Sequence, residues 1–412
     1  MDSVAGVVIA SPSRQDPDYY FHWIRDSALV IDSLLITVQP QDFSSTLFQK
    51  NLNDYILFSR RLQLTPSQTG LGEPRFNVDG TAFNGPWARP QNDGPALRAL
   101  TLLHALQFNL SAEQRNKISE ILETDLDFIQ SHRDQPSFDI WEEIRADHFY
   151  TRVAQMAALK KAIQNFDPAW KFSIFDCEAA RAHLESNLQK HWSDEKKYFS
   201  ISQNRVEGGD NKKTDLDTAV ILGVLHAGLN QDILFSVRND RVLATAEKLE
   251  KVFERIYEIN QSKKSFQLAP AIGRYEDDVY FGGNPWYLTT LAFAELHYRL
   301  AESLQQDNNF EITDLNFAFL SQAGATKIKD FKPGLNLKNS SSAAKELTEL
   351  LRLRGDQFVE RVRLHTPKDG SLAEQFSRKN GYATSARDLT WSYASFLTAI
   401  QARTEISKGV SK

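Results

Sequence analysis

Helical periodicity of apolar residues recurs along almost the whole of this 412-residue chain, and alternating, strand-like patterns are scarce. Several segments also carry helix-start signals. Ser111 precedes an acidic turn, Pro95 lies in a first turn, and Asp388 opens the last segment. The pattern predicts helices over residues 23–38, 42–64, 92–109, 112–132, 143–165, 175–190, 214–228, 240–260, 285–306, 343–366 and 388–405. An all-α fold is therefore expected.

Some connections between these helices are long and rich in Gly, Pro, Asn and aromatic residues: 66–94, 133–142, 264–285 and 367–387. Loops of this kind on a helical scaffold either carry binding and catalysis or simply close one end of a barrel. A different segment, 322–344, is rich in Ser, Lys, Asn and Gly and predicts a mobile surface insertion without chemistry.

Charge and cysteine content exclude several classes of protein. A net charge of −5 and an isoelectric point near 6.0 give no basic field for nucleic acid. No apolar run approaches the roughly 18 residues of a membrane span. With Cys177 alone, an internal disulfide is impossible and a thiolate metal site is disfavoured.

The opening residues lack the basic and apolar regions of a secretory leader. The chain as given is therefore expected to be intracellular, either cytoplasmic or vacuolar. It would be secreted if an N-terminal leader is missing from this sequence.

Two acidic stretches suit hydrolysis of a glycosidic bond, which usually needs one carboxylic acid and one carboxylate on opposite sides of a sugar. In Trp141-Glu142-Glu143 the carboxylates would point about 100° apart if the segment enters a helix, so they would do different jobs. The Trp141 ring and the second carboxylate favour a protonated acid. Paired Glu residues are also common at helix starts, and Glu374, in the second stretch, could be an ordinary solvated loop residue.

Aromatic residues beside Arg and Asp recur in three further segments. Aromatic faces stack on sugar rings, while a fixed guanidinium and carboxylate bind hydroxyl groups. A helix start with a salt-bridged Arg is the simpler explanation for any one of these segments. Their candidate binding residues are Tyr19, Trp23, Arg25, Asp26, Trp87, Arg274, Tyr280 and Trp286.

Other chemistries lack their motifs. No His pair has zinc-ligand spacing, and neither a nucleophile elbow nor a phosphate-binding or dinucleotide-binding loop is present. Cys177 lacks the electropositive setting of a reactive thiol. The residues therefore favour carbohydrate chemistry.

Taken together, these segments closely resemble the fungal glucoamylases of glycoside hydrolase family 15. The matching stretches are Val7 to Ser13, Asp18 to Leu29, Leu71 to Leu100, Phe138 to Glu143, Ile272 to Leu288 and Leu372 to Thr398. The resemblance implies an (α/α)6 barrel of twelve helices and a single catalytic domain over residues 1–412. The absence of a starch-binding domain after the barrel is expected from the sequence as a departure from the family pattern. It also implies release of β-glucose, with inversion, from the non-reducing ends of starch, glycogen or maltooligosaccharides, and slower cleavage of α-1,6 links.

By the same resemblance, Glu142 is the general acid and Glu374 the general base. The resemblance also implies a pocket tyrosine at Tyr19, a second subsite wall at Trp286, and binding of the terminal sugars by Arg25, Asp26, Trp87, Glu143 and Arg274. Three further rings of these segments are expected to bind substrate as well: Trp23, Trp141 and Tyr280. No metal or organic cofactor is expected. The substrate is an α-glucan, and the protein is expected to be a monomer.

The chain departs from the family pattern at its start, where eleven rather than twelve helices are predicted and the first helix is missing. Two alternatives therefore stay open. One is a truncated, non-catalytic glucan-binding member of the family, and the other is a different (α/α)6 glycosidase such as a trehalase.

Overall fold

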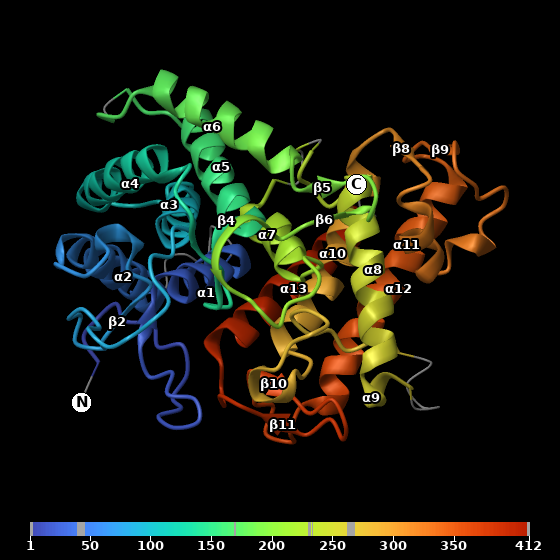
Figure 1. Cartoon of the computed structure of the whole chain (residues 1–412). Coiled ribbons are helices and arrows are strands. Elements are labelled where there is room, and N and C mark those ends of the chain that lie inside the picture. Colours follow the sequence, from blue (N-terminus) through green and yellow to red (C-terminus); the bar gives the residue numbers. More distant parts are fainter. Residues whose placement is uncertain are drawn as a thin grey trace. The chain divides into compact units, whose positions relative to one another are not determined.

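The computed structural model describes residues 3–38, 46–168, 170–229, 232, 234–261 and 268–409. It is mostly helical (Figure 1). The helices are α1 (Ile24–Thr37), α2 (Thr46–Leu64), α3 (Gly94–Ala105), α4 (Ala112–His132), α5 (Phe149–Gln164), α6 (Ile174–Gln189), α7 (Ala219–Ala227), α8 (Asp240–Ile256), α9 (Glu258–Gln261), α10 (Tyr287–Gln306), α11 (Phe317–Gln322), α12 (Ser342–His365) and α13 (Thr390–Gly409).

Most predicted helices are confirmed within a few residues. The predicted helix over 42–64 begins among residues 39–45, which lie outside the described part, and the same holds for residues 264–267 of one predicted loop. The predicted helix over 240–260 is divided into α8 and the short α9. Within the described residues ahead of α1 there is no helix.

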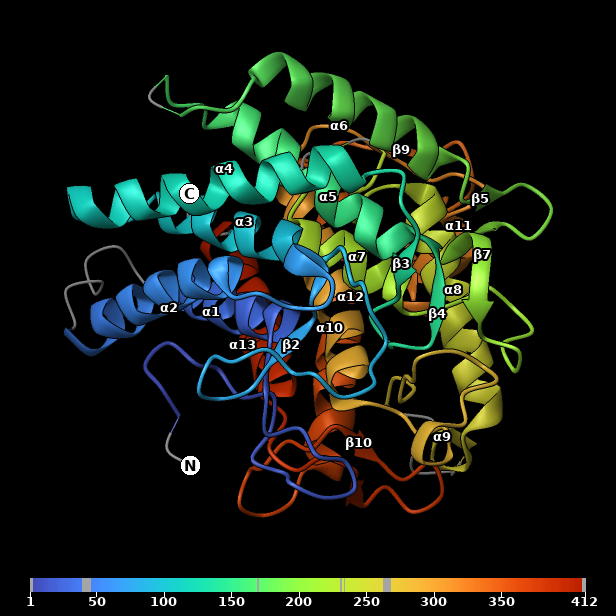
Figure 2. The ribbon, with the colours of Figure 1, turned by 60° about the vertical axis from the view of Figure 1, so that its left-hand side comes forward.

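The prediction that a helix starts at residue 143 is wrong. Ile144–His148 forms strand β4, and α5 begins only at Phe149. β4 pairs on one side with β3 (Ser137–Phe138) and on the other with β7 (Ser202–Gly208). Figure 2 shows β4 and β7 alongside each other. Glu142 and Glu143 therefore lie in a turn between two strands.

The chain forms two compact units. The first contains Met1–His191, Ser202–Gly209 and Leu389–Ala394, and the second contains Trp192–Ile201, Asp210–Asp388 and Ser395–Lys412. The expected single domain over 1–412 stays a prediction. Among the described residues, no helix is both long and apolar enough to cross a membrane.

In the first unit, α3 packs against α1, α4 and α5 (Figure 2). All but one of the residues of α3 are buried, which explains its almost uninterrupted apolar sequence. α4 starts at a capping box. The Ser111 hydroxyl accepts the Gln114 N–H at 3.2 Å, and the Gln114 side chain accepts the Ser111 N–H at 2.9 Å.

In the second unit, α10 packs against α7 and α12. The loops of the second unit contain three short antiparallel strand pairs: β5 (Trp192–Ser193) with β6 (Tyr198–Phe199), β8 (Phe310–Glu311) with β9 (Asn336–Leu337), and β10 (Gln375–Phe376) with β11 (Ala383–Thr384). Residues 322–344 contain β9, and Ile328 and Leu337 in this segment are each 3% exposed. Its mobility stays a prediction.

Candidate active site

A junction between strand β1 and helix α1 positions three of the predicted site residues, Trp23, Arg25 and Asp26. His22–Trp23 forms β1, which pairs with β2 (Arg75–Phe76), and α1 begins at the next residue, Ile24. Arg25 and Asp26 thus lie in the first turn of α1, where both are buried. A buried Arg–Asp pair in a first turn is costly unless it is well partnered.

Asp139 shapes the turn that carries Glu142. Its carboxylate accepts the backbone N–H groups of Glu143 and Ile144 at 2.7 and 3.0 Å, and its carbonyl accepts that of Glu142 at 3.0 Å. Glu142 adopts a left-handed backbone conformation with φ 64°. Non-glycine residues held this way cost about 1–3 kcal/mol and occur often at functional sites. The turn fixes where the Glu142 side chain begins.

Three side chains, from two segments of the chain, reach the Glu142 carboxyl. The Trp23 indole N–H donates to Oε1 at 2.8 Å, and the Gln91 amide donates to the same oxygen at 2.9 Å. The guanidinium of Arg25 lies 3.8 Å from it. The Glu142 side chain remains 17% exposed. It is thus held on one oxygen and still accessible.

A buried charge network lies behind Glu142. Arg25 Nη1 donates to Gln91 Oε1 and to Asp93 Oδ2, both at 2.9 Å, and its Nε lies 3.8 Å from Asp26. Burial alone would lower the pKa of Arg25, but Asp93, Asp26 and Glu142 raise it above its usual value. Burial raises the pKa of Asp26 to about 6, opposed by Arg25. Arg25 therefore stays a fixed cation in this network.

Aromatic rings form a wall beside these groups. Tyr19 meets Trp23 edge-on at 5.4 Å between centroids, and Trp23 meets Trp87 at 6.0 Å. Trp141 stacks on Trp391 at 6.5 Å, and Arg25 lies 5.7 Å from the Trp391 ring. The first unit therefore brings together most of its predicted site residues, and Glu143 lies next to Glu142 in the same turn.

Arg75 fixes this wall and was missed from the sequence. Its guanidinium lies 3.5 to 5.0 Å from the centroids of Trp87, Phe83, Phe21 and Trp23. It is 4% exposed, and burial lowers its pKa to about 10. Cation–π contacts of this kind are strengthened by exclusion of water.

The second unit carries the other predicted residues, and Arg274 is the centre of one group. Arg274 forms a two-point ion pair with Asp278, with N–O distances of 2.8 and 2.5 Å. Its guanidinium lies 5.0 Å from the Tyr280 ring and 5.5 Å from Trp286, and these two rings are 6.2 Å apart. Arg274 is 2% exposed. The ion pair therefore fixes a guanidinium beside two rings.

Glu374 is held next to this group by backbone pairing. Its carbonyl accepts the Tyr287 N–H at 3.2 Å, and its N–H donates to Ala386 at 2.8 Å. Its carboxylate Oε2 accepts the Gln375 amide at 3.0 Å and the Ser385 hydroxyl. Glu374 is 1% exposed, so it is not the solvated loop residue of the alternative explanation. The two donors at Oε2 hold the carboxylate in one orientation.

The residues that bind Arg25, Arg274 and Glu374 were also missed in the prediction from the sequence. They are Gln91, Asp93, Asp278 and Ser385. Gln91 and Asp93 belong to the Arg-Pro-Gln-Asn-Asp-Gly-Pro segment next to Trp87, and Asp278 follows Arg274 by four residues. That proximity was an available signal. Ser385 gave none, because it reaches Glu374 across the β10–β11 hairpin.

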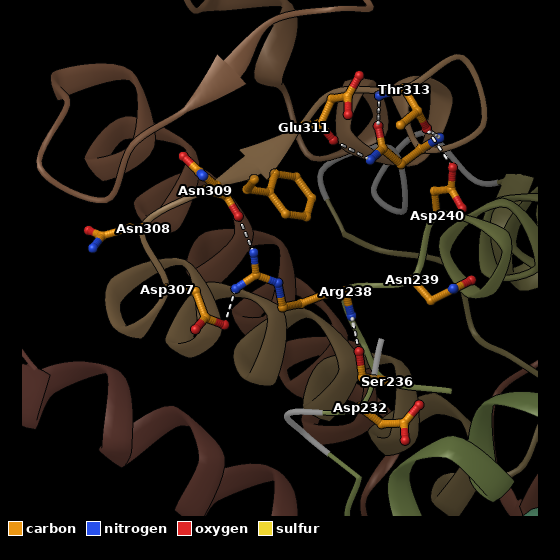
Figure 3. A pocket seen from close by; sticks show the side chains of 12 residues that line it. Asp232, Ser236, Arg238, Asn239, Asp240, Asp307, Asn308, Asn309, Glu311 and Thr313 are labelled. Atoms are coloured by element: carbon orange, nitrogen blue, oxygen red, sulfur yellow. Dashed lines mark hydrogen bonds and ion pairs between the residues drawn. The ribbon is translucent and has the colours of Figure 1, made fainter. Parts of the chain in front are cut away.

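A separate polar cavity of about 780 Å³ lies in the second unit (Figure 3). Asp307, at the C-terminal end of α10, is among the residues that line this cavity. Trp286 lies at the opposite end of the same 20-residue helix, just before its first residue. At 1.5 Å per residue, the helix separates the two places by about 30 Å. Arg238 there binds Asp307, and Thr313 donates to Asp240 at 3.0 Å. The predicted site residues do not line this cavity.

Within the described ranges, no group of three or more His, Cys, Asp or Glu side chains is arranged to hold a metal ion. The residues gathered around Glu142 and Glu374 are carboxylates, carboxamides, guanidinium groups and rings. Carboxyl groups can transfer protons, whereas carboxamides and guanidinium groups bind hydroxyls and rings stack on sugar faces.

The comparisons with known proteins agree with this chemistry. A family model described as "Glycosyl hydrolases family 15" matches residues 1–401. A glucoamylase of Blastobotrys adeninivorans is 34% identical over 426 residues, covering 97% of this chain and 68% of that protein. The solved family 15 glucoamylase of Hypocrea jecorina is similar with a TM-score of 0.86 and 32% identity, covering 98% of this chain and 68% of that one. For the glucoamylase of Saccharomycopsis fibuligera the TM-score is 0.85 at 30% identity, covering 98% and 90%.

These findings define the class of protein as an all-α glycosidase with the (α/α)6-barrel fold of its family. The chain belongs to the glycosyl hydrolases family 15. The resemblance to fungal glucoamylases that the sequence predicted is therefore confirmed.

Proposed function

We propose that this chain is an inverting, exo-acting glucosidase that releases β-D-glucose from the non-reducing ends of α-1,4-glucans and acts more slowly on α-1,6 links. The family match and the similarity to glucoamylases over almost the whole chain favour a glucan-hydrolysing enzyme over a non-catalytic member or a trehalase. The observation that carries the proposal is the Glu142 carboxyl, accessible but held at Oε1 by Trp23 and Gln91.

Glu142 acts as the general acid. It protonates the glycosidic oxygen as the bond to the anomeric carbon breaks, and Arg25 and the ring wall fix its direction. Proton transfer by a positioned carboxyl group typically contributes about 10²- to 10⁴-fold to the rate. Protonation turns the departing sugar into a neutral alcohol.

Glu374 acts as the general base. It removes a proton from a water molecule that attacks the anomeric carbon from the opposite face, so the configuration inverts. This mechanism needs room for water, and inverting enzymes generally provide it by holding their two carboxyl groups about 6.5–9.5 Å apart. The Ser385 hydroxyl and the Gln375 amide hold the base in one orientation.

The remaining site residues bind sugar. Arg25 and Asp26 anchor hydroxyls of the terminal glucose, which makes the pocket dead-ended and the enzyme exo-acting. Rings stack on sugar faces, and charged groups bind further hydroxyls. The proposed set is Tyr19, Trp23, Arg25, Asp26, Trp87, Trp141, Glu143, Arg274, Tyr280 and Trp286.

Digestion of maltoheptaose tests the exo-acting part of the proposal. We expect chromatography of early time points to show glucose and maltohexaose as the first products, because a dead-ended pocket admits only a chain end. Equal early amounts of maltotriose and maltotetraose would show internal cleavage and contradict the proposal. Absence of any hydrolysis would favour the non-catalytic alternative.

The monomeric state and the intracellular compartment expected from the sequence stay predictions. Light scattering on a sizing column measures the first. A mass close to 46.9 kDa is expected for a monomer.

A further inference from the structure

Gln91 has a fixed amide orientation although it belongs to no helix or strand. Arg25 has only N–H donors, and its Nη1 lies 2.9 Å from one end of the Gln91 amide, so that end must be the carbonyl oxygen. The NH2 end therefore faces Glu142 Oε1 at 2.9 Å and the carbonyl of Ala88 at 3.0 Å. Asp93 in turn holds Arg25 at 2.9 Å. The orientation is fixed from Asp93 through Arg25 to Gln91.

This orientation decides which oxygen of Glu142 carries a proton. Oε1 accepts hydrogen bonds from two N–H groups, those of Trp23 and Gln91. Neither N–H group could accept a hydrogen bond from a hydroxyl at Oε1. A carboxyl oxygen that accepts two donors is the carbonyl-type oxygen, because a hydroxyl there would lose part of this bonding. The hydroxyl of the neutral acid is therefore placed on Oε2.

We propose that Gln91 is a positioning residue: by donating to Oε1 of Glu142, it places the acid proton of Glu142 on Oε2. The inference rests on the proposed role of Glu142 as general acid. Gln91 is 2% exposed, so it acts through Glu142 rather than on the sugar. Without its N–H, Oε1 keeps only the Trp23 donor, so the preference of the proton for Oε2 weakens and part of the acid population cannot deliver it to the glycosidic oxygen.

The Gln91→Leu variant tests this with two substrates that share the glucosyl group. Maltotriose needs protonation of its leaving oxygen, whereas α-D-glucosyl fluoride releases fluoride with little need for an acid. We expect kcat for maltotriose to fall about 10-fold or more, with kcat for the fluoride changed less than about 3-fold, because only the general-acid contribution is reduced. KM for maltotriose should stay within about 2-fold, because Gln91 does not bind the sugar and Asp93 still holds Arg25 in place.

Gln155→Leu is the matched control. Gln155 is also a buried amide of the first unit, binding the Asn92 carbonyl at 3.2 Å and Arg152 at 3.1 Å, and it does not bond to Glu142. The ratio of the two kcat values should be unchanged in this control.

Equal loss of kcat for both substrates in Gln91→Leu would show a merely structural role and overturn the inference. Gln91→Asn, whose shorter side chain cannot bridge Arg25 and Glu142, must shift the ratio in the same direction if Gln91→Leu does not fold. An unchanged ratio in a folded Gln91→Asn would equally overturn it. Failure of the unsubstituted protein to hydrolyse either substrate is a different result, which contradicts the proposed function itself.

Discussion

Replacement of Glu142 by Gln is expected to reduce kcat for maltotriose by about 10²- to 10⁴-fold, the range of general acid catalysis. The amide can still accept N–H groups of Trp23 and Gln91 at its oxygen, so the position of the side chain is retained while its proton is lost. Maltose binding, measured by calorimetry, should persist. Hydrolysis of α-D-glucosyl fluoride should fall far less, because fluoride leaves without a proton.

Glu207→Gln is the control for this change. Glu207 is an exposed carboxylate on β7, paired with Arg145 of β4 in the same unit, and its replacement should leave both activities unchanged. Full activity of Glu142→Gln on maltotriose would show that another group supplies the proton.

Replacement of Glu374 by Ala has a different expected signature. Both maltotriose and α-D-glucosyl fluoride need an activated water, so kcat for both should fall by about 10²- to 10⁴-fold. Glu374 is 1% exposed, and its truncation leaves space for a small anion where the carboxylate was. Added azide should therefore attack α-D-glucosyl fluoride and form β-D-glucosyl azide, detectable by mass spectrometry and NMR.

Glu360→Ala removes a carboxylate from the surface of α12 in the same unit and should give neither the loss nor the azide product. If Glu374→Ala kept its activity on both substrates, or lost activity on maltotriose alone, Glu374 would not be the base.

Much of the fold could be predicted because its signals are local. α10, predicted over 285–306, is found at Tyr287–Gln306, since Gly283 and Pro285 mark its start and apolar residues recur along it at helical spacing. α11 was missed because six residues are too few to show a period. β4 lies in a segment predicted as helix, since its pairing with β7 joins distant residues, such as Ile144 with Gly208, and leaves no local trace.

The candidate site divides in the same way. Arg25, Trp23 and Arg274 could be chosen because aromatic and charged residues adjoin them in sequence. The roles of Gln91 and Arg75 depend on contacts with α1 and β1 that no spacing reveals, such as the bond between Gln91 and Arg25, 66 positions away. The turn at Glu142 is likewise set by Asp139, whose carboxylate accepts the backbone N–H groups of Glu143 and Ile144. These residues therefore form a turn where a helix start was expected.

The configuration of the first glucose released tests the central claim most directly, because an acid and a base acting from opposite faces must invert the anomeric carbon. Proton NMR during the first minutes of maltotriose hydrolysis, before mutarotation, should show the β-anomer of glucose. Initial appearance of the α-anomer would mean retention, and would contradict the assignment of Glu142 and Glu374 as an inverting pair.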